Sequence, residues 1–204
     1  AAQVAVTTSV AEPRNDMEQN ILGTFNVLEA IRGSAHKPPI IYSSTNKVYG
    51  ALEMYPVRDA GKRYEFENDE YRMHGVPETQ QLDFHSPYGC SKGAADQYVI
   101  DYDRIYGLRT LSLRQSCIYG TNQFGVEDQG WIAWFTIAAL LGKPVTIYGD
   151  GKQVRDVLYV DDLARAYERA VADIDHVRGQ VFNIGGGPRH ALAIGDIFPF
   201  LEEW

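Results

Sequence analysis

Short apolar runs alternate with helical patterns along this chain, and no other feature of the sequence constrains its fold as strongly. From Pro13 onward, apolar residues recur at spacings of three or four, which predicts a helix that ends near Gly33. Further along, the sequence predicts strands over 40–42, 110–113 and 181–184 and helices over 89–105 and 161–172. This order indicates βαβ units, and therefore an α/β fold whose parallel sheet is flanked by helices. Such sheets bind ligands at the carboxyl ends of their strands.

Three segments depart from this alternation. Residues 50–86 show no hydrophobic period, and an irregular stretch of that length is more often functional than decorative. Residues 131–141 are apolar on every side, which predicts a buried helix. Two strand-like runs, 145–148 and 154–159, flank Gly149-Asp150-Gly151, and a turn of this kind predicts a hairpin.

Composition limits the classes of function. With 204 residues, of which 45% are hydrophobic and 23% charged, the chain has the size of one large globular domain or one and a half. Its formal net charge of −8 disfavours nucleic acids and anionic membranes as partners. No apolar run reaches the ~18–20 residues that a membrane-spanning helix needs.

Cysteine and histidine usage gives no sign of a disulfide framework or a metal centre. Cys90 and Cys117 are the only cysteines, and the histidines show no metal-ligand spacing. A reducing, cytoplasmic location is therefore expected. Residues 1–6 resemble the tail of a buried strand, and residues 197–204 are apolar in a helical pattern. These ends lead us to expect an internal fragment of a longer protein.

The strongest local pattern is Tyr88-Gly-Cys-Ser-Lys92. Residues four apart share one face of a helix, so the ammonium group of Lys92 is predicted to lie near the phenol of Tyr88. A neighbouring cation lowers the pKa of a phenol from ~10, and a phenol tuned in this way can act as a base on a sugar hydroxyl. The alternative is an ordinary tyrosine and lysine on a surface helix.

Two further segments could take part in the same chemistry. Ser43-Ser44-Thr45 follows the strand predicted at 40–42 and places three hydroxyls where a parallel sheet binds its ligand, although a turn or helix cap is the alternative. Arg155 lies beside the predicted hairpin, where its fork of donors could hold a diphosphate, unless it only pairs with Asp156. Gly185-Gly186-Gly187 lacks the spacing of a phosphate-binding loop and is predicted to be a turn that ends a strand.

Taken together, these motifs resemble the extended short-chain dehydrogenase/reductase family, which comprises nucleotide-sugar epimerases and dehydratases. The match runs along almost the whole chain. It includes Asn20-x-x-Gly23-Thr24, Ser43-Ser44-Thr45-x-x-Val48-Tyr49-Gly50, Tyr88-x-x-x-Lys92, Arg155-Asp156-Val157-x-Tyr159 and Phe182-Asn183-Ile184-Gly185-Gly186. Within the family, residues 43–50, 81–98 and 128–131 are similar to enzymes that epimerise CDP-linked dideoxyhexoses at C2.

The resemblance implies a Rossmann-like parallel sheet flanked by helices, without the N-terminal part that carries the family's glycine-rich fingerprint, and part of a smaller substrate-binding lobe. It assigns residues 1–120 and 154–184 to a truncated NAD-binding domain and residues 121–153 and 185–204 to the lobe. It further implies tightly held NAD, a nucleotide-diphosphate sugar such as a CDP sugar as substrate, and a homodimer or homotetramer joined through helices 14–32 and 89–106. No metal, nucleic acid or membrane is expected as a partner.

The family's functional residues map onto this chain position by position. Thr45 would hydrogen-bond the reacting oxygen, Tyr88 would take the proton of the C2 hydroxyl, and Lys92 would hold the nicotinamide ribose. The positions that match cofactor contacts are Ala1, Ala2, Asn20, Ser43, Ser44, Tyr88, Lys92 and Gln115. The positions assigned to the substrate are Gln3, Thr45, Asn46, Cys117, Gln123, Lys143, Gln153 and Arg155, with Arg155 expected on the diphosphate.

Three other functions share parts of this pattern. A 4,6-dehydratase resembles this chain but carries an Asp-Glu pair after its threonine, so Asn46-Lys47 weighs against elimination. A UDP-sugar 4-epimerase uses the same threonine, tyrosine and lysine and stays open. A non-catalytic binder of nucleotide sugars, or an assembly module, is disfavoured by the intact Thr45, Tyr88 and Lys92 but favoured by the missing fingerprint.

Overall fold

The computed structural model describes residues 2–202, which divide into two compact units. The first unit contains residues 2–51, 78–115 and 164–184, and the second contains residues 52–77, 116–163 and 185–202. This division differs from the predicted domain boundaries, which place residues 52–77, 116–120 and 154–163 in the first domain. Helix α7, Val160–Ala172, contributes residues to both units.

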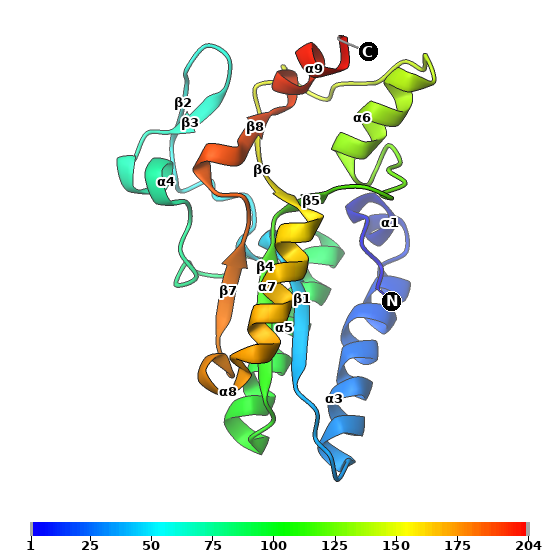
Figure 1. Cartoon of the computed structure of the whole chain (residues 1–204), viewed down its shortest axis with the longest axis vertical. Coiled ribbons are helices and arrows are strands. Elements are labelled where there is room, and N and C mark those ends of the chain that lie inside the picture. The colour runs from blue at the N-terminus through cyan, green and yellow to red at the C-terminus, as the bar shows by residue number, and fades with distance from the viewer. Residues whose placement is uncertain (1, 203–204) are drawn as a thin grey trace. The chain divides into compact units, whose positions relative to one another are not determined.

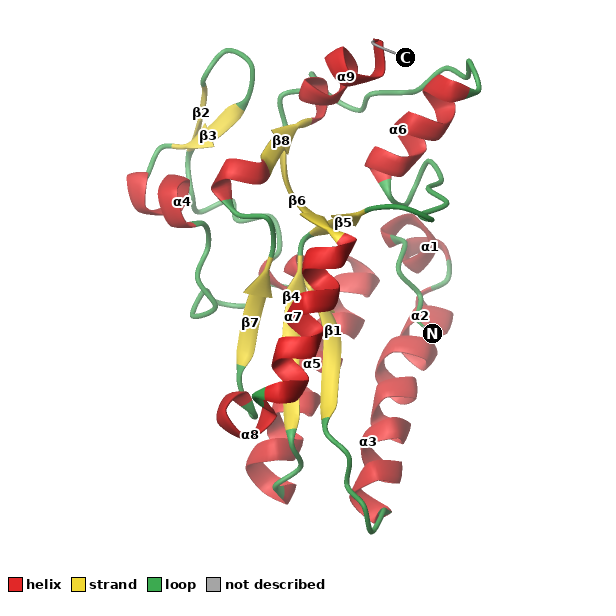
Figure 2. Ribbon diagram, viewed as in Figure 1, coloured by secondary structure: helices red, strands yellow, loops and turns green. Residues whose placement is uncertain are grey.

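A three-stranded parallel sheet forms the centre of the first unit and confirms the predicted α/β fold. Its order is β1 (Ile40–Thr45), β4 (Thr110–Gln115) and β7 (Val181–Ile184). Thr45 pairs with Gln115, so the polar ends of β1 and β4 lie level at the carboxyl edge of the sheet. Figure 1 and Figure 2 show α7 on one face of this sheet and α5 on the other.

Helices and short turns complete the first unit. They are α1 (Val6–Ala11), α2 (Pro13–Met17), the π-helical turn η1 (Glu18–Leu22), α3 (Gly23–Gly33), the 3-10 turn η2 (Asn46–Tyr49), α5 (Ser86–Tyr106) and α8 (Ile174–Val177). Leu28 of α3 and Val99 of α5 pack in a cluster on one face of the sheet. On the other face, Leu111 of β4 packs in a separate cluster with Ala170 of α7. Alternate residues of each strand therefore face different helices.

The N-terminal region departs from the sequence-based expectation in two places. Residues 2–5 are irregular and lead into α1, where the tail of a strand was expected. The helix predicted from Pro13 is interrupted by η1, which buries Asn20 to 2% exposure. Short π-helical segments inside a helix are frequent at functional sites.

The second unit contains a small mixed sheet and a separate hairpin. In the sheet, β6 (Val154–Tyr159) lies between β5 (Cys117–Tyr119), which is parallel to it, and β8 (Ala191–Ala193), which is antiparallel. The hairpin pairs β2 (Val57–Asp59) with β3 (Tyr64–Phe66). The other elements are α4 (Asp69–His74), α6 (Trp131–Leu140), η3 (Pro188–His190), η4 (Ile194–Ile197) and α9 (Phe198–Glu202).

Two local predictions are wrong in this unit. Residues 145–148 form no strand, because β5 and β8 already pair with the two edges of β6. Helix α6 is not buried all round: Phe135 packs against η4 and α9, whereas Leu140 is 71% exposed.

Polar contacts explain why residues 52–77 group with the second unit. The backbone N–H of Tyr64 donates to the carbonyl of Lys152 at 3.0 Å, and its hydroxyl donates to Asp150 at 2.8 Å. The ammonium of Lys152 also lies 2.6 Å from the carboxylate of Asp59. These contacts fix the hairpin to the segment that precedes β6. Because they join residues far apart in the sequence, they could not be used to predict the domain boundaries.

The described part of the chain contains neither a helix that could span a membrane nor a cluster of metal-ligating side chains. None of its helices has the length and apolar character to cross a membrane. Residues 2–202 also contain no group of three histidine, cysteine, aspartate or glutamate side chains placed to hold a metal ion.

Candidate active site

Thr45, Tyr88 and Lys92, the three residues predicted to be catalytic, come together in the first unit. Thr45 ends β1, and Tyr88 and Lys92 lie one turn apart on α5, which packs against that strand. The side chain of Thr45 lies close enough to the hydroxyl of Tyr88 to lower the pKa of that phenol. Their exposures are 7%, 9% and 6%, so a proton moved among these groups is largely shielded from bulk water.

The Lys92 side chain is fixed by two contacts with β1. Its ammonium group donates a hydrogen bond to the backbone carbonyl of Ser43 and lies 4.3 Å from the ring centroid of Tyr42. An aromatic face attracts a desolvated cation, so Tyr42 offsets part of the cost of burying this charge. One hydrogen bond leaves further N–H donors of the ammonium for a ligand.

Local packing determines where α5 begins and how closely it approaches its neighbours. Pro87 occupies the first turn, and the backbone N–H of Tyr88 donates to the hydroxyl of Ser9 at 3.1 Å. A Cβ atom at Gly93 would lie 2.2 Å from the ring of Phe84, so only glycine allows this approach. The sequence thereby places Tyr88 and Lys92 on a constrained helical turn rather than on a surface helix.

Burial dominates the electrostatics of both residues. It raises the pKa of Tyr88, an effect that the hydrogen bond from Thr45 opposes and the charge of Asp16 reinforces. Burial also lowers the pKa of Lys92 to about 8, against the opposing effect of Asp96 and Asp16. The prediction that Lys92 lowers the pKa of Tyr88 is wrong for the chain by itself, because the Lys92 ammonium contacts Ser43 and Tyr42 instead.

Two residues predicted to bind the cofactor are joined by a tyrosine that the sequence analysis missed. The hydroxyl of Tyr167 on α7 hydrogen-bonds the hydroxyl of Ser43 and accepts a hydrogen bond from Gln115 Nε2 at 2.7 Å. Its ring packs in the apolar cluster beneath the sheet, so the helical spacing of Tyr167 indicated only a core residue. Ser44, one residue along β1, faces the other way and lies near the carboxylate of Asp96.

The predicted cofactor residues near the N-terminus retain polar atoms for a ligand. Asn20 Nδ2 donates to the backbone carbonyl of Gln3 at 3.1 Å, whereas Asn20 Oδ1 and Gln3 Oε1 are buried without a hydrogen-bond partner in the described chain. Buried acceptors without partners are rare and point to a missing donor. The polar groups of an NAD molecule fit this requirement. Ala2 is exposed, and Ala1 lies outside the described residues.

Most residues assigned to the substrate belong to the second unit. Cys117 begins β5, Lys143 lines a small apolar pocket beside α6, and Gln153 donates to the backbone carbonyl of Tyr148. Gln123 donates to the carbonyl of Ile118 at 3.2 Å. Arg155 is exposed on β6, and its guanidinium contacts the carbonyl of Val154 at 3.0 Å. Gln3, Thr45 and Asn46 lie in the first unit.

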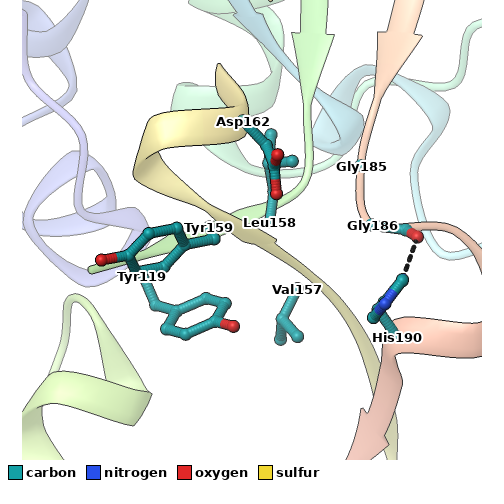
Figure 3. A pocket seen from close by; sticks show the side chains of 8 residues that line it. All are labelled: Tyr119, Val157, Leu158, Tyr159, Asp162, Gly185, Gly186 and His190. Carbon is teal, nitrogen blue, oxygen red and sulfur yellow. Dashed lines mark hydrogen bonds between the residues drawn. The ribbon is translucent and has the colours of Figure 1, made fainter. Parts of the chain in front are cut away.

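A pocket of about 250 Å³ lies within the second unit and contains none of the predicted site residues. Figure 3 shows the tyrosine side chains and His190 around it, and Nδ1 of His190 lies 2.7 Å from the carbonyl of Gly186. The residues that line it are Tyr119, Val157, Leu158, Tyr159, Asp162, Gly185, Gly186 and His190.

The glycine triplet beside this pocket is a turn, as predicted, and an internal carboxylate occupies its donors. Asp156 accepts hydrogen bonds from the backbone N–H groups of Gly186 and Gly187 at 2.9 and 3.0 Å. A Cβ atom at Gly185 would lie 1.8 Å from Asp156 Oδ2, so glycine is required at that position. The carboxylate of Asp156 therefore accepts hydrogen bonds from this turn, whereas the alternative given above was an ion pair with Arg155.

This parallel α/β sheet, with threonine, tyrosine and lysine buried at its carboxyl edge, has the arrangement expected of the extended short-chain dehydrogenase/reductase class. A family model described as "NAD dependent epimerase/dehydratase family" matches residues 1–185, and the chain belongs to that family.

Curated relatives and solved structures are consistent with this assignment. The chain is 49% identical to CDP-paratose 2-epimerase of Salmonella typhi over its full length, which covers 61% of that protein. It is 31% identical to a putative UDP-glucose 4-epimerase of Methanocaldococcus jannaschii, of which it covers 58%. The chain therefore spans about three fifths of the length of these relatives.

Two solved structures share the fold over the whole chain. The UDP-glucose 4-epimerase of Thermotoga maritima, solved with UDP-glucose, has a TM-score of 0.78 at 35% identity, and the chain covers 58% of it. The UDP-glucose 4-epimerase of Thermus thermophilus, solved with NAD, has a TM-score of 0.77 at 32% identity and 59% coverage.

Proposed function

We propose that the protein epimerises a nucleotide sugar by transient oxidation of one hydroxyl-bearing carbon, and that its reaction converts CDP-paratose to CDP-tyvelose at C2. The observation that carries this proposal is the joint burial of Thr45, Tyr88 and Lys92: Thr45 ends β1, Tyr88 and Lys92 lie one turn apart on α5, and the Lys92 ammonium donates to the carbonyl of Ser43 on β1. These side chains can orient a hydroxyl, accept its proton and stabilise the resulting charge.

Each residue has a defined part in the chemistry. Thr45 donates a hydrogen bond to the reacting oxygen, and Tyr88 accepts the hydroxyl proton as the C2–H bond breaks. Lys92 donates a hydrogen bond to the ribose of the cofactor through the ammonium donors that Ser43 leaves free. Bound NAD+ supplies the acceptor for the hydride and its return. The 2-keto sugar turns over in the site, Tyr88 returns the proton, and the net reaction inverts C2 without consuming redox equivalents.

We assign the cofactor-binding residues to both faces of the sheet, at the carboxyl ends of β1 and β4. Lys92 and Asn20 offer free hydrogen-bonding atoms on the α5 side, and Ser43 and Gln115 lie on the α7 side, joined by Tyr167. We assign Arg155 to the diphosphate of the substrate because its exposed guanidinium retains donors for a bidentate contact.

The choice of a CDP sugar and of C2 is supported by the 49% identity to CDP-paratose 2-epimerase. The alternative is a UDP-sugar 4-epimerase, which is supported by relatives of that description at 31–35% identity. Asn46-Lys47 after Thr45 argues against a dehydratase, because neither side chain is a carboxylic acid that could protonate a leaving hydroxyl.

The test is to incubate the full-length protein with CDP-paratose, without added NAD, and to follow the C2 proton by NMR. Growth of CDP-tyvelose supports 2-epimerisation with resident cofactor, and Tyr88→Phe should reduce the rate at least ~10²-fold. No change at C2, together with turnover of UDP-glucose, would establish the 4-epimerase instead. No turnover of either sugar by a protein that still binds CDP would support a binding function.

We also propose that the protein self-associates through α3 and α5. Phe25 and Tyr98 contact each other across these helices with ring centroids 6.0 Å apart, and they are 36% and 45% exposed. Aromatic side chains of this kind are enriched at protein interfaces. Light scattering after size exclusion should give a dimer or tetramer, and Tyr98→Glu should give a monomer.

A further inference from the structure

A buried carboxylate lies near the helical turn that carries Tyr88 and Lys92, and the proposed mechanism does not use it. Asp16, on α2, is only 1% exposed. Its Oδ1 accepts a hydrogen bond from Asn20 Nδ2 at 3.1 Å, and its Oδ2 has no hydrogen-bond partner among residues 2–202. A carboxylate buried in this way is costly unless a positive charge compensates for it.

Asn20 connects Asp16 to the helical turn that carries the site. Asn20 Nδ2 also lies 3.1 Å from the hydroxyl of Ser91, which in turn donates to the carbonyl of Tyr88 at 3.2 Å. Ser91 immediately precedes Lys92. Asp16 is therefore held beside α5 by side chains that are themselves 2% exposed, and the π-helical turn η1 places Asn20 at this position.

Two buried carboxylates, those of Asp16 and Asp96, oppose the effect of burial on the pKa of Lys92. Asp96 already has a partner, because Arg114 contacts it through two nitrogens at 2.9 and 3.2 Å. In the part of the chain that the structure describes, Asp16 forms no such pair, and Lys92 is the cation whose charge it influences.

We propose that Asp16 is a positioning residue of this site: its buried carboxylate is the counter-charge of Lys92 and holds the resting site as a phenol beside an ammonium. The proposal rests on the proposed function only for its consequence in catalysis. In the chain itself, a negative charge favours the ammonium form of Lys92 and disfavours the phenolate form of Tyr88. Asp16 thus maintains the charge that binds a ribose while it opposes early loss of the Tyr88 proton.

Other titratable groups that face Lys92 do not serve this purpose. Tyr42, from β1, has its pKa raised by burial and stays neutral. The hydrogen bonds and charge of Arg114, together with Ser112, overcome the effect of burial and keep the pKa of Asp96 below its usual value. Tyr88 is the acid whose state the proposal describes. Asp16 is therefore the carboxylate that can be neutralised to change the charge near Lys92 without leaving the buried guanidinium of Arg114 unpaired.

Asp16→Asn removes the charge and keeps the side-chain shape, so the Lys92 ammonium and the Tyr88 phenol should both titrate at lower pH. The experiment uses the full-length protein, freed of cofactor, with ¹³C at lysine Cε and tyrosine Cζ, and Lys92→Arg and Tyr88→Phe assign the signals. Lys92 should titrate near pH 8 in the unmodified protein. In Asp16→Asn, the midpoints of Lys92 and Tyr88 should both fall by ~1 unit.

The matched control is Asp101→Asn, which removes the same charge from an exposed position on α5. Asp101 pairs with Arg104 at 3.3 Å, and both side chains are at least half exposed. Solvent screens such a charge, so this variant should leave both midpoints unchanged. Equal shifts in the two variants would show a general field effect and overturn the proposal.

The remaining outcomes are also decisive. Unchanged midpoints in Asp16→Asn overturn the proposal, and if that variant does not fold, Asp16→Ser removes the charge with a smaller side chain and should give the same shifts. In active protein, Asp16→Asn should move the pH optimum of epimerisation to lower pH, whereas a purely structural role would lower the rate at every pH alike. Because the titrations need neither cofactor nor turnover, their result stands even if CDP-paratose is not the substrate.

Discussion

Breaking the buried ion pair between Asp96 and Arg114 from one side should cause a large loss of stability in the first unit. Both side chains are buried, with exposures of 0% and 4%, and the guanidinium contacts the carboxylate at 2.9 and 3.2 Å. Ser112 donates a further hydrogen bond to Asp96 at 2.6 Å, and Arg114 donates one to Tyr49 at 2.9 Å. Every charged atom of the pair therefore has a partner.

Asp96→Asn leaves a buried guanidinium without its counter-charge. Loss of one partner of a buried pair costs about 3–5 kcal/mol, and the amide keeps some hydrogen bonds, so we expect a loss of about 3 kcal/mol. For a chain of this size, that loss corresponds to a fall in Tm of about 6–12 °C. By contrast, Asp96→Leu combined with Arg114→Met removes both charges and should recover most of the stability.

The pH dependence provides a second measurement. Burial alone raises the pKa of Asp96, but hydrogen bonds from Arg114 and Ser112 and the Arg114 charge outweigh it and lower the pKa. A carboxyl group whose pKa is lowered by folding stabilises the protein above its unfolded pKa of ~3.9 and loses that contribution as pH falls through the folded value. The stability difference between the protein and Asp96→Asn should thus stay constant from about pH 5 to pH 8 and shrink below about pH 4.

Thermal and urea unfolding followed by circular dichroism measure both effects. The control is Glu18→Gln, which breaks an exposed pair with Arg14 and should change stability by less than about 0.5 kcal/mol. A loss below about 1 kcal/mol in Asp96→Asn would refute the reasoning, because breaking the pair would then cost no more than breaking a surface contact. A difference that grows as pH falls would also refute it.

Three further variants test packing and the proposed cofactor site. Leu28→Ala should cost about 2–5 kcal/mol in urea unfolding because Leu28 is fully buried, whereas Val27→Ala, at a 53% exposed position, should cost less than about 0.5 kcal/mol. Gly93→Ala should cost about 1–3 kcal/mol because its new methyl group would meet the ring of Phe84, and an unchanged Tm would contradict that contact. Tyr167→Phe removes a hydroxyl with two hydrogen bonds and should weaken NADH binding several-fold in a fluorescence titration, through a loss of about 0.5–1.5 kcal/mol. Unaltered NADH affinity would place Tyr167 outside the cofactor site.

Sequence reasoning was most successful where the pattern was local and repeated. The alternation of strands and helices predicted the parallel sheet, because each element must bury one apolar face or stripe against the next. The same reasoning failed at 145–148, since a turn motif favours a hairpin but cannot show that β5 and β8 occupy both edges of β6. It also missed η1, because one extra residue in a helical turn barely changes the hydrophobic period.

The candidate site could be predicted only in part for a similar reason. Tyr88 and Lys92 are four residues apart in one helix, and that spacing alone places them together. Tyr167 and Asp16 approach the site through tertiary contacts, from α7 and α2. In the sequence, Tyr167 matches the apolar stripe of its helix, and Asp16 matches an ordinary acidic residue in a first turn.

The alternation of side chains along β1 and β4 divides the surroundings of the site into a charged half and a neutral half. On the α5 side, Lys92, Asp96 and Arg114 lie together, with Asp16 beside them. On the α7 side, the polar contacts of Ser43 and Gln115 join neutral groups, and the hydroxyl of Tyr167 connects them. Charges interact strongly over several ångströms at low dielectric, whereas neutral hydrogen bonds act only at contact. Substitutions on the α5 side should therefore shift the titration of the site, and substitutions on the α7 side should change ligand affinity equally at every pH.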